Sequence, residues 1–95
     1  MSPRWATIGS AGLYFYAEEP HRRPHVDVVG PDWDVKIDLA TLTELNSSGR
    51  PPPALIRRVL GLLREHQDLA VAAFEATRNH RLPGTLEQQL EDEDA

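Results

Sequence analysis

The segment Trp33-Asp34-Val35-Lys36-Ile37-Asp38-Leu39 alternates strictly between apolar and charged side chains. Successive side chains of a β-strand point to opposite faces, so this alternation predicts a strand with one buried face and one solvated face. A sheet of this kind needs a second layer to cover its apolar face. The segment therefore predicts a domain in which a sheet packs against helical structure.

Three stretches before this segment also have strand character. Residues 5–8, 13–17 and 25–29 are rich in aromatic and β-branched side chains. Residues 41–45 form a further short candidate, and the polar and proline-rich residues 46–53 are predicted to be a connector. The turns between the stretches are short, whereas parallel strands need long crossovers, so we expect an antiparallel meander of about four strands.

Residues 54–79 predict the layer that covers the sheet. They contain no proline, and their large apolar side chains fall on one half of a helical wheel. Pro83 and Gly84 then predict that the helix has ended. The predicted fold is α+β with two layers, in which the meander packs on one long C-terminal helix and residues 1–83 form a single domain.

The net charge of −5 is concentrated at the end of the chain. Residues 1–83 carry ten basic and ten acidic side chains, whereas residues 84–95 carry five acids and no base. A neutral body exerts no bulk attraction on phosphate, which argues against a general nucleic-acid binder. Residues 84–95 are predicted to be an acidic flexible tail, with at most a short helix where Thr85 and Gln88 have capping-box spacing.

Composition restricts the kinds of site that the chain can form and the cellular location that we expect. The chain has no cysteine, which removes disulfides, thiolate metal sites and cysteine nucleophiles. No apolar run approaches the ~20 residues that cross a bilayer, so we expect no membrane association. The first residues lack the apolar core of a signal peptide, and we therefore expect a cytoplasmic protein.

His21, His25 and Asp27 are the candidate catalytic residues. His25 and Asp27 are two positions apart on a predicted strand and so project from one face, while His21 lies on a loop stiffened by two prolines. Imidazole and carboxylate groups bind zinc or manganese, and they also act as acid and base. We predict that the three form one solvent-exposed cluster, with recognition, acid–base catalysis and metal binding as open alternatives.

His66 is the candidate fourth metal ligand. It falls within the apolar arc of the predicted helix, where a histidine is usually buried and hydrogen-bonded to a backbone carbonyl. Val26 and Val28 are predicted to face the helix, so His25 and Asp27 should face away from it. The alternation thus predicts that His66 meets the other two only if the helix covers an edge of the sheet.

A candidate binding surface lies beside this cluster. Tyr14 and Tyr16 share a strand face, with Leu13 and Phe15 on the opposite one. Exposed aromatic side chains mark contact surfaces more often than active sites. Arg22 and Arg23 would lie next to the tyrosines, where they could hold a phosphate or a carboxylate of a partner.

The order of these motifs resembles a family of small bacterial proteins, domain of unknown function family 4160. The resemblance runs over residues 8–75, from the aromatic strand at 14–16 through the two histidines to Glu65 and His66. Asp27 stands where the family pattern has a histidine. The resemblance implies a member of a two-gene toxin–antitoxin-type module, and it raises interest in His21, His25 and His66 without assigning them a reaction.

Three functions therefore compete. The leading expectation is an interaction protein that binds a cognate small protein through the Tyr14 and Tyr16 face or the acidic tail. The second is a small nuclease-like toxin that acts on RNA through His21, His25 and Asp27, and the third is a regulatory module that binds a divalent metal. Self-association as a homodimer is a further alternative, and whether the chain is an enzyme stays open.

Overall fold

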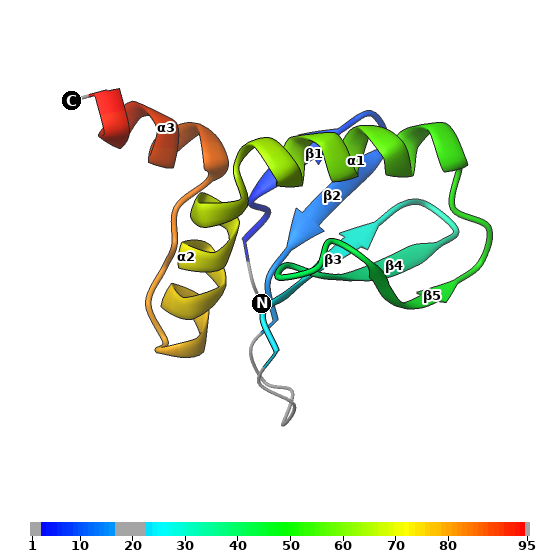
Figure 1. Cartoon of the computed structure of the whole chain (residues 1–95), viewed down its shortest axis with the longest axis horizontal. Coiled ribbons are helices and arrows are strands. Elements are labelled where there is room, and N and C mark those ends of the chain that lie inside the picture. The colour runs from blue at the N-terminus through cyan, green and yellow to red at the C-terminus, as the bar shows by residue number, and fades with distance from the viewer. Residues whose placement is uncertain (1–2, 17–22, 95) are drawn as a thin grey trace.

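The computed structural model describes residues 3–16 and 23–94, and it shows a meander of five strands (Figure 1). The strands are β1 (Ala6–Ile8), β2 (Ala11–Tyr14), β3 (His25–Val29), β4 (Asp34–Asp38) and β5 (Glu44–Ser48). They lie in the order β1-β2-β3-β4-β5, and each pairs antiparallel with its neighbour. The predicted antiparallel meander is confirmed, with five strands instead of about four, because the further short candidate also forms a strand. This strand, β5, runs from Glu44 to Ser48, so residues 46–48 are not part of the predicted connector.

The register of β4 confirms the alternation that decides the fold, except that Asp38, predicted to be solvated, is 1% exposed. Val35 and Ile37 are each 1% exposed, whereas Asp34 is exposed and Lys36 is partly buried. Val35 lies opposite Val28, and Ile37 lies opposite Val26, so apolar side chains of neighbouring strands share the core face. A shift by one residue would invert every one of these side chains, which is why the pattern specifies the register so strongly.

The expectation of one helix over residues 54–79 is wrong, because the helix is interrupted at His66. Helix α1 (Pro53–Glu65) and helix α2 (Gln67–Arg78) meet there, where His66 has φ −122° and ψ 35°. Hydrogen bonds from His66 N to Leu62 O and from Ala70 N to His66 O, both 3.0 Å, carry the helical pattern across the bend. The bend therefore costs few hydrogen bonds, and no proline or glycine marks it in the sequence.

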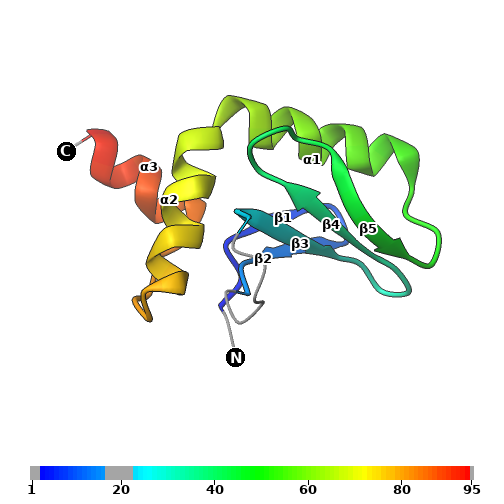
Figure 2. The same cartoon turned by 60° about the horizontal axis from the view of Figure 1, so that its bottom comes forward.

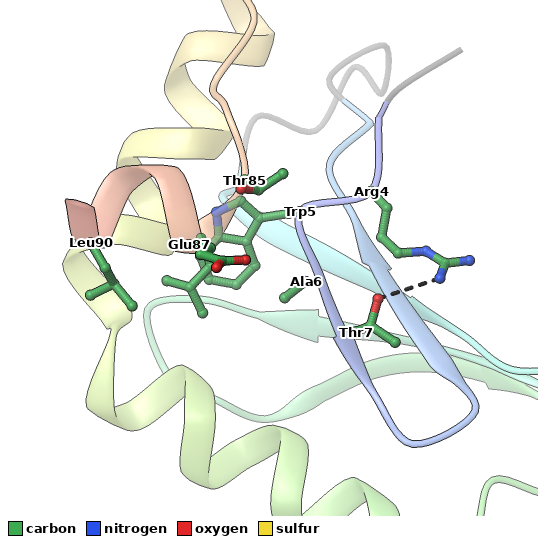
Figure 3. Close-up of a pocket in the computed structure, with 8 residues that line it drawn as sticks. Arg4, Trp5, Ala6, Thr7, Thr85, Glu87 and Leu90 are labelled. Carbon is green, nitrogen blue, oxygen red and sulfur yellow. Dashed lines mark hydrogen bonds between the residues drawn. The ribbon is translucent and has the colours of Figure 1, made fainter. Parts of the chain in front are cut away.

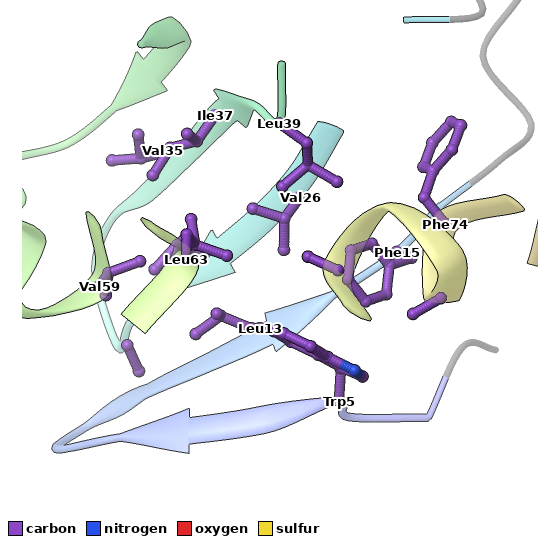
Figure 4. Close-up of a cluster of buried hydrophobic side chains, with 14 of the residues drawn as sticks. Trp5, Leu13, Phe15, Val26, Val35, Ile37, Leu39, Val59, Leu63 and Phe74 are labelled. Atoms are coloured by element: carbon purple, nitrogen blue, oxygen red, sulfur yellow. The ribbon is translucent and has the colours of Figure 1, made fainter. Parts of the chain in front are cut away.

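The bend lets the two helices cover different parts of the sheet. Helix α1 lies across one face of the sheet, and α2 turns away to pack at its end (Figures 1 and 2). Val59 and Leu63 of α1 and Phe74 of α2 are buried in one core with the strands (Figure 4). None of the helices in residues 3–16 and 23–94 has the length and apolar content needed to span a membrane.

The end of the chain forms helix α3 (Leu86–Asp94), and it docks on the body. The predicted capping box is confirmed, because Gln88 N donates to Thr85 Oγ1 at 3.1 Å and Thr85 N donates to Gln88 Oε1 at 2.8 Å. The short helix allowed for this segment is present, but the expectation that the segment buries little is wrong at Leu86. Leu86 is 8% exposed, its N–H donates to Trp5 O at 2.9 Å, and Trp5 Nε1 donates to Gln89 Oε1 at 2.6 Å. Figure 3 shows Trp5 beside Thr85 and Glu87 at the start of α3.

Candidate functional site

The face of the sheet opposite to α1 carries a row of polar side chains. Tyr14 of β2 lies opposite Asp27 of β3, Asp27 lies opposite Lys36 of β4, and Lys36 lies opposite Asn46 of β5. Residues in register on adjacent strands project from the same face, so the four side chains run across the sheet. We call this surface, together with Tyr16 and Val29, the open face.

Two stacked tyrosines form one side of the open face. The rings of Tyr14 and Tyr16 have centroids 6.0 Å apart and an interplanar angle of 15°. Arg4 supports the pair, since its Nε donates to the Tyr14 hydroxyl at 3.1 Å and its guanidinium lies 5.7 Å from the centre of that ring. Leu13 and Phe15 are buried, which confirms the prediction that the two tyrosines share the opposite face of the strand.

A shallow depression of about 230 Å³ lies next to the tyrosines. Its lining residues are Tyr16, Asp27, Val29, Asp34, Lys36 and Asn46. Lys36 Nζ lies 3.9 Å from Asp27 Oδ1, so the floor carries an ion pair. Burial raises the pKa of the Tyr16 hydroxyl, and the negative charge of Asp27 raises it further. Tyr16 and Val29 remain 39% and 38% exposed, so the depression is rimmed by apolar surface that a partner could cover.

His25 does not lie on this open surface, and the expectation that it is solvent-exposed is wrong. Its side chain is on the same strand face as Asp27, but it is only 5% exposed, and its ring lies 5.3 Å from the ring of Phe74 on α2. Its Nδ1 is 2.9 Å from Arg23 O, and because a carbonyl only accepts, Nδ1 carries the proton. Nε2 is buried and has no hydrogen-bond partner among the described residues.

The neighbour of His25 across the sheet is Asp38, which organises this end of the strands. Asp38 is 1% exposed, and its carboxylate accepts hydrogen bonds from Ala40 N at 2.8 Å, from Thr41 N at 3.1 Å and from Arg23 Nε at 2.7 Å. Burial alone would raise the pKa of Asp38, but the hydrogen bonds from Thr41, Arg23 and Ala40 outweigh it and lower the pKa below its usual value. Arg23, predicted to bind a partner, is thus engaged by a carboxylate of its own chain.

Among the remaining predicted site residues, His66 is not grouped with His25 and Asp27. His21 and Arg22 lie outside the described residues. His66 lies at the junction of α1 and α2, where its Nε2 is 3.9 Å from Glu65 Oε1 and its side chain is 19% exposed. Within the two described ranges, no three histidine, aspartate or glutamate side chains are grouped so that they could hold a metal ion.

Two features of this surface were not anticipated from the sequence. The role of Asp38 was missed, although an aspartate followed within three residues by a turn is a known signal for side-chain bonds to the backbone. A hollow of about 480 Å³ also lies between β1 and α3, with Trp5 and Leu86 among its lining residues (Figure 3). It arises from the docking of α3, and no predicted site residue lines it.

Comparison with known proteins gives a single match. No curated protein and no solved structure matches the chain significantly. The sequence model of a domain family described as Domain of unknown function (DUF4160) matches residues 12–75. The matched range runs from β2 to α2 and so includes both the open face and the buried polar end of the sheet. Because the match covers more than half of the chain, the protein belongs to the DUF4160 family.

Proposed function

We propose that this chain is an interaction protein that binds a cognate small protein through the open face. The observation that carries the proposal is the stacked pair of half-buried Tyr14 and exposed Tyr16 beside the depression. Tyrosine offers a large contact area and a hydroxyl group at a low cost in side-chain entropy, and it is enriched in protein interfaces. Stacking holds the two rings in place before a partner arrives, which lowers the entropy lost on binding.

The charges of the open face support a protein partner. Asp27 and Lys36 lie within 3.9 Å of each other, so the floor of the depression presents both signs of charge rather than a field of one sign. Such a surface is suited to the mixed polar contacts that surround the apolar centre of an interface. We further propose that the partner is the product of an adjacent gene in a bacterial two-gene module of the toxin–antitoxin type.

The nuclease-like and metal-binding alternatives are not our proposal. A nuclease role for His25 requires its free Nε2 to reach a phosphodiester, and the burial of this atom argues against that. The buried ring packs against Phe74 and is hydrogen-bonded to a backbone carbonyl. Such contacts are typical of a histidine that stabilises the fold.

The test is a binding measurement with the product of the adjacent gene, made by isothermal titration calorimetry. Tyr16→Ala should weaken binding at least about tenfold, which corresponds to ~1.4 kcal/mol. Leu82→Ala is the matched control, because Leu82 is 84% exposed in a loop and lies outside the open face. Equal affinity of wild type and Tyr16→Ala would show that the open face is not the interface.

Membership of a toxin–antitoxin-type module has a separate test. Each of the two genes is induced alone in a bacterial host, and then both are induced together. We expect one of them to arrest growth alone and the other to restore it. Normal growth under both single inductions would contradict the toxin–antitoxin part of the proposal and leave the binding result as it stands.

A further inference from the structure

The charges of the chain are segregated in a way that the net charge conceals. Residues 45–64 contain four arginines and no acidic residue. The rest of the chain contains six basic and fifteen acidic residues, so it carries nine negative charges in excess. The positive stretch includes β5 residues and nearly the whole of α1.

Three of these arginines project from one side of α1. Val59 and Leu63 are buried under the helix, whereas Arg57, Arg58 and Arg64 are exposed. None of the three guanidinium groups forms an ion pair with a side chain of residues 3–16 or 23–93. The outer side of α1 faces away from the sheet (Figures 1 and 2). It is therefore a positive surface, although Arg64 at its end lies beside an acidic hollow lined by Glu65, Asp68 and Glu93.

The same side of α1 carries an exposed glycine that the fold does not require. Gly61 lies in the interior of the helix, where glycine is less favourable than any residue except proline. A Cβ atom added at Gly61 would meet no atom within 4 Å, so packing within the chain gives no reason for its absence. Glycine at such a position lets another backbone approach closely, and the exposed Ala54 two turns earlier is also small.

We propose that the outer side of α1 binds an acidic helix of a partner protein. The partner's backbone would pass over Gly61 and Ala54, and its carboxylates would pair with Arg57, Arg58 and Arg64. Arginine is suited to this role because its planar guanidinium forms two parallel hydrogen bonds with a carboxylate. This inference rests on the proposed function only in taking the partner to be a protein. The surface that it assigns to the partner is separate from the open face.

A protein helix fits these observations better than a nucleic acid does. A DNA duplex carries one charge per ~1.7 Å of its axis and extends well beyond a single helix of a small domain. Glu65, Asp68 and Glu93 line one hollow beside Arg64, so a duplex that extends past the end of α1 would meet their negative charges within the screening length. A short acidic helix lies along α1 alone, and its charge density is lower.

The experiment measures binding of the full chain to a synthetic helical peptide by fluorescence anisotropy. The peptide carries glutamates at positions i, i+3, i+4 and i+7 with alanines between them, and a matched peptide carries glutamine in their place. An RNA hairpin and a DNA duplex of similar length are measured at the same ionic strength. Amide chemical shifts from NMR spectra locate the surface that each probe contacts.

The expected result is saturable binding of the glutamate peptide, with shifts centred on residues 54–64. The double substitution Arg57→Glu and Arg58→Glu should weaken it at least about tenfold, because charge reversal replaces attraction by repulsion. Arg78→Glu is the control at an exposed arginine outside α1 and should leave the affinity unchanged. Gly61→Gln should weaken binding while raising the melting temperature, since glutamine favours the helix and blocks close approach.

Three results would overturn the inference. They are equal binding of the glutamate and glutamine peptides, equal loss in the Arg78→Glu control, and tighter binding of the RNA or DNA than of the peptide. Absence of peptide binding to a folded wild-type chain also counts against it. Tyr16→Ala should leave peptide binding unchanged, so failure at the open face and failure at α1 are distinguishable.

Discussion

His25 and Asp27 lie two residues apart on β3 and project from the same face of the strand, yet their surroundings are opposite. His25 is 5% exposed, packs against Phe74 and lies across from the buried Asp38. Asp27 lies across from Lys36 and lines an open depression. The difference shows that strand alternation assigns a side chain to a face of the sheet. The elements packed at the end of the sheet then decide whether that side chain is exposed to solvent.

The two regions also differ in what their polar groups do. At the covered end, Asp38 is bonded by Arg23 and by the backbone of the following turn, so its charge is satisfied within the chain. On the open face, Tyr16 and Val29 keep more than a third of their surface exposed. The covered end therefore stabilises the fold, and the open face is where a partner could contribute new contacts.

Replacement of Asp38 should have the largest effect. Asp38→Ala leaves two backbone N–H groups without their acceptor and removes the bond to the largely exposed Arg23, so we expect a loss of about 2–4 kcal/mol in the free energy of unfolding. Urea denaturation at pH 7 measures it. Asp34→Ala is the matched control on the same strand, where the exposed side chain should cost less than ~0.5 kcal/mol. Similar losses in both variants would remove the distinction between the two regions.

The pH dependence of stability should report the same carboxylate. The pKa of Asp38 is lowered in the folded chain, whereas in the unfolded chain it is near ~3.9. Between these two values the unfolded chain binds the proton, so the contribution of Asp38 is present above pH ~4 and is lost as the pH falls through the folded pKa. Unfolding free energies from pH 7 to 2 should fall more steeply for wild type than for Asp38→Asn, and parallel curves would contradict this.

Replacement of His25 and of His66 should lower the free energy of unfolding by different amounts, both smaller than the loss at Asp38. His25→Ala removes a buried ring and its bond to Arg23 O, and we expect a loss of about 1–3 kcal/mol. His66→Ala should cost under ~1 kcal/mol, because His66 is partly exposed and already lies at a break between helices. Thermal denaturation of both variants is the measurement. The opposite order would show that the covered end does not depend on His25.

The smallest effect concerns the open face itself. Burial and then Asp27 raise the pKa of the Tyr16 hydroxyl, so Asp27→Asn should lower that pKa toward its ordinary value. Two-dimensional NMR of the labelled tyrosine rings follows the titration, with Tyr16→Phe identifying the signals. The substitution should change the free energy of unfolding by less than about 1 kcal/mol. An unchanged Tyr16 titration would mean that Asp27 does not act on this ring.

The sequence alone determined the features that depend on neighbours along the chain. The alternation of residues 33–39 specified the faces of β4, and the same period placed Tyr14 and Tyr16 opposite Leu13 and Phe15. The capping box of Thr85 and Gln88 was predictable because its two hydrogen bonds span only three residues. Side-chain period and local hydrogen bonds are properties of a few consecutive residues.

Only the tertiary structure decided the features that join distant segments. The bend at His66 brings Phe74 onto His25, and the docking of α3 brings Gln89 to Trp5, although these partners are 49 and 84 residues apart in the sequence. The Arg23 and Asp38 pair likewise depends on how β3 and β4 are aligned. Each such contact is stabilised by burial and hydrogen bonding that exist only once both segments are in place. No local sequence pattern therefore predicts it.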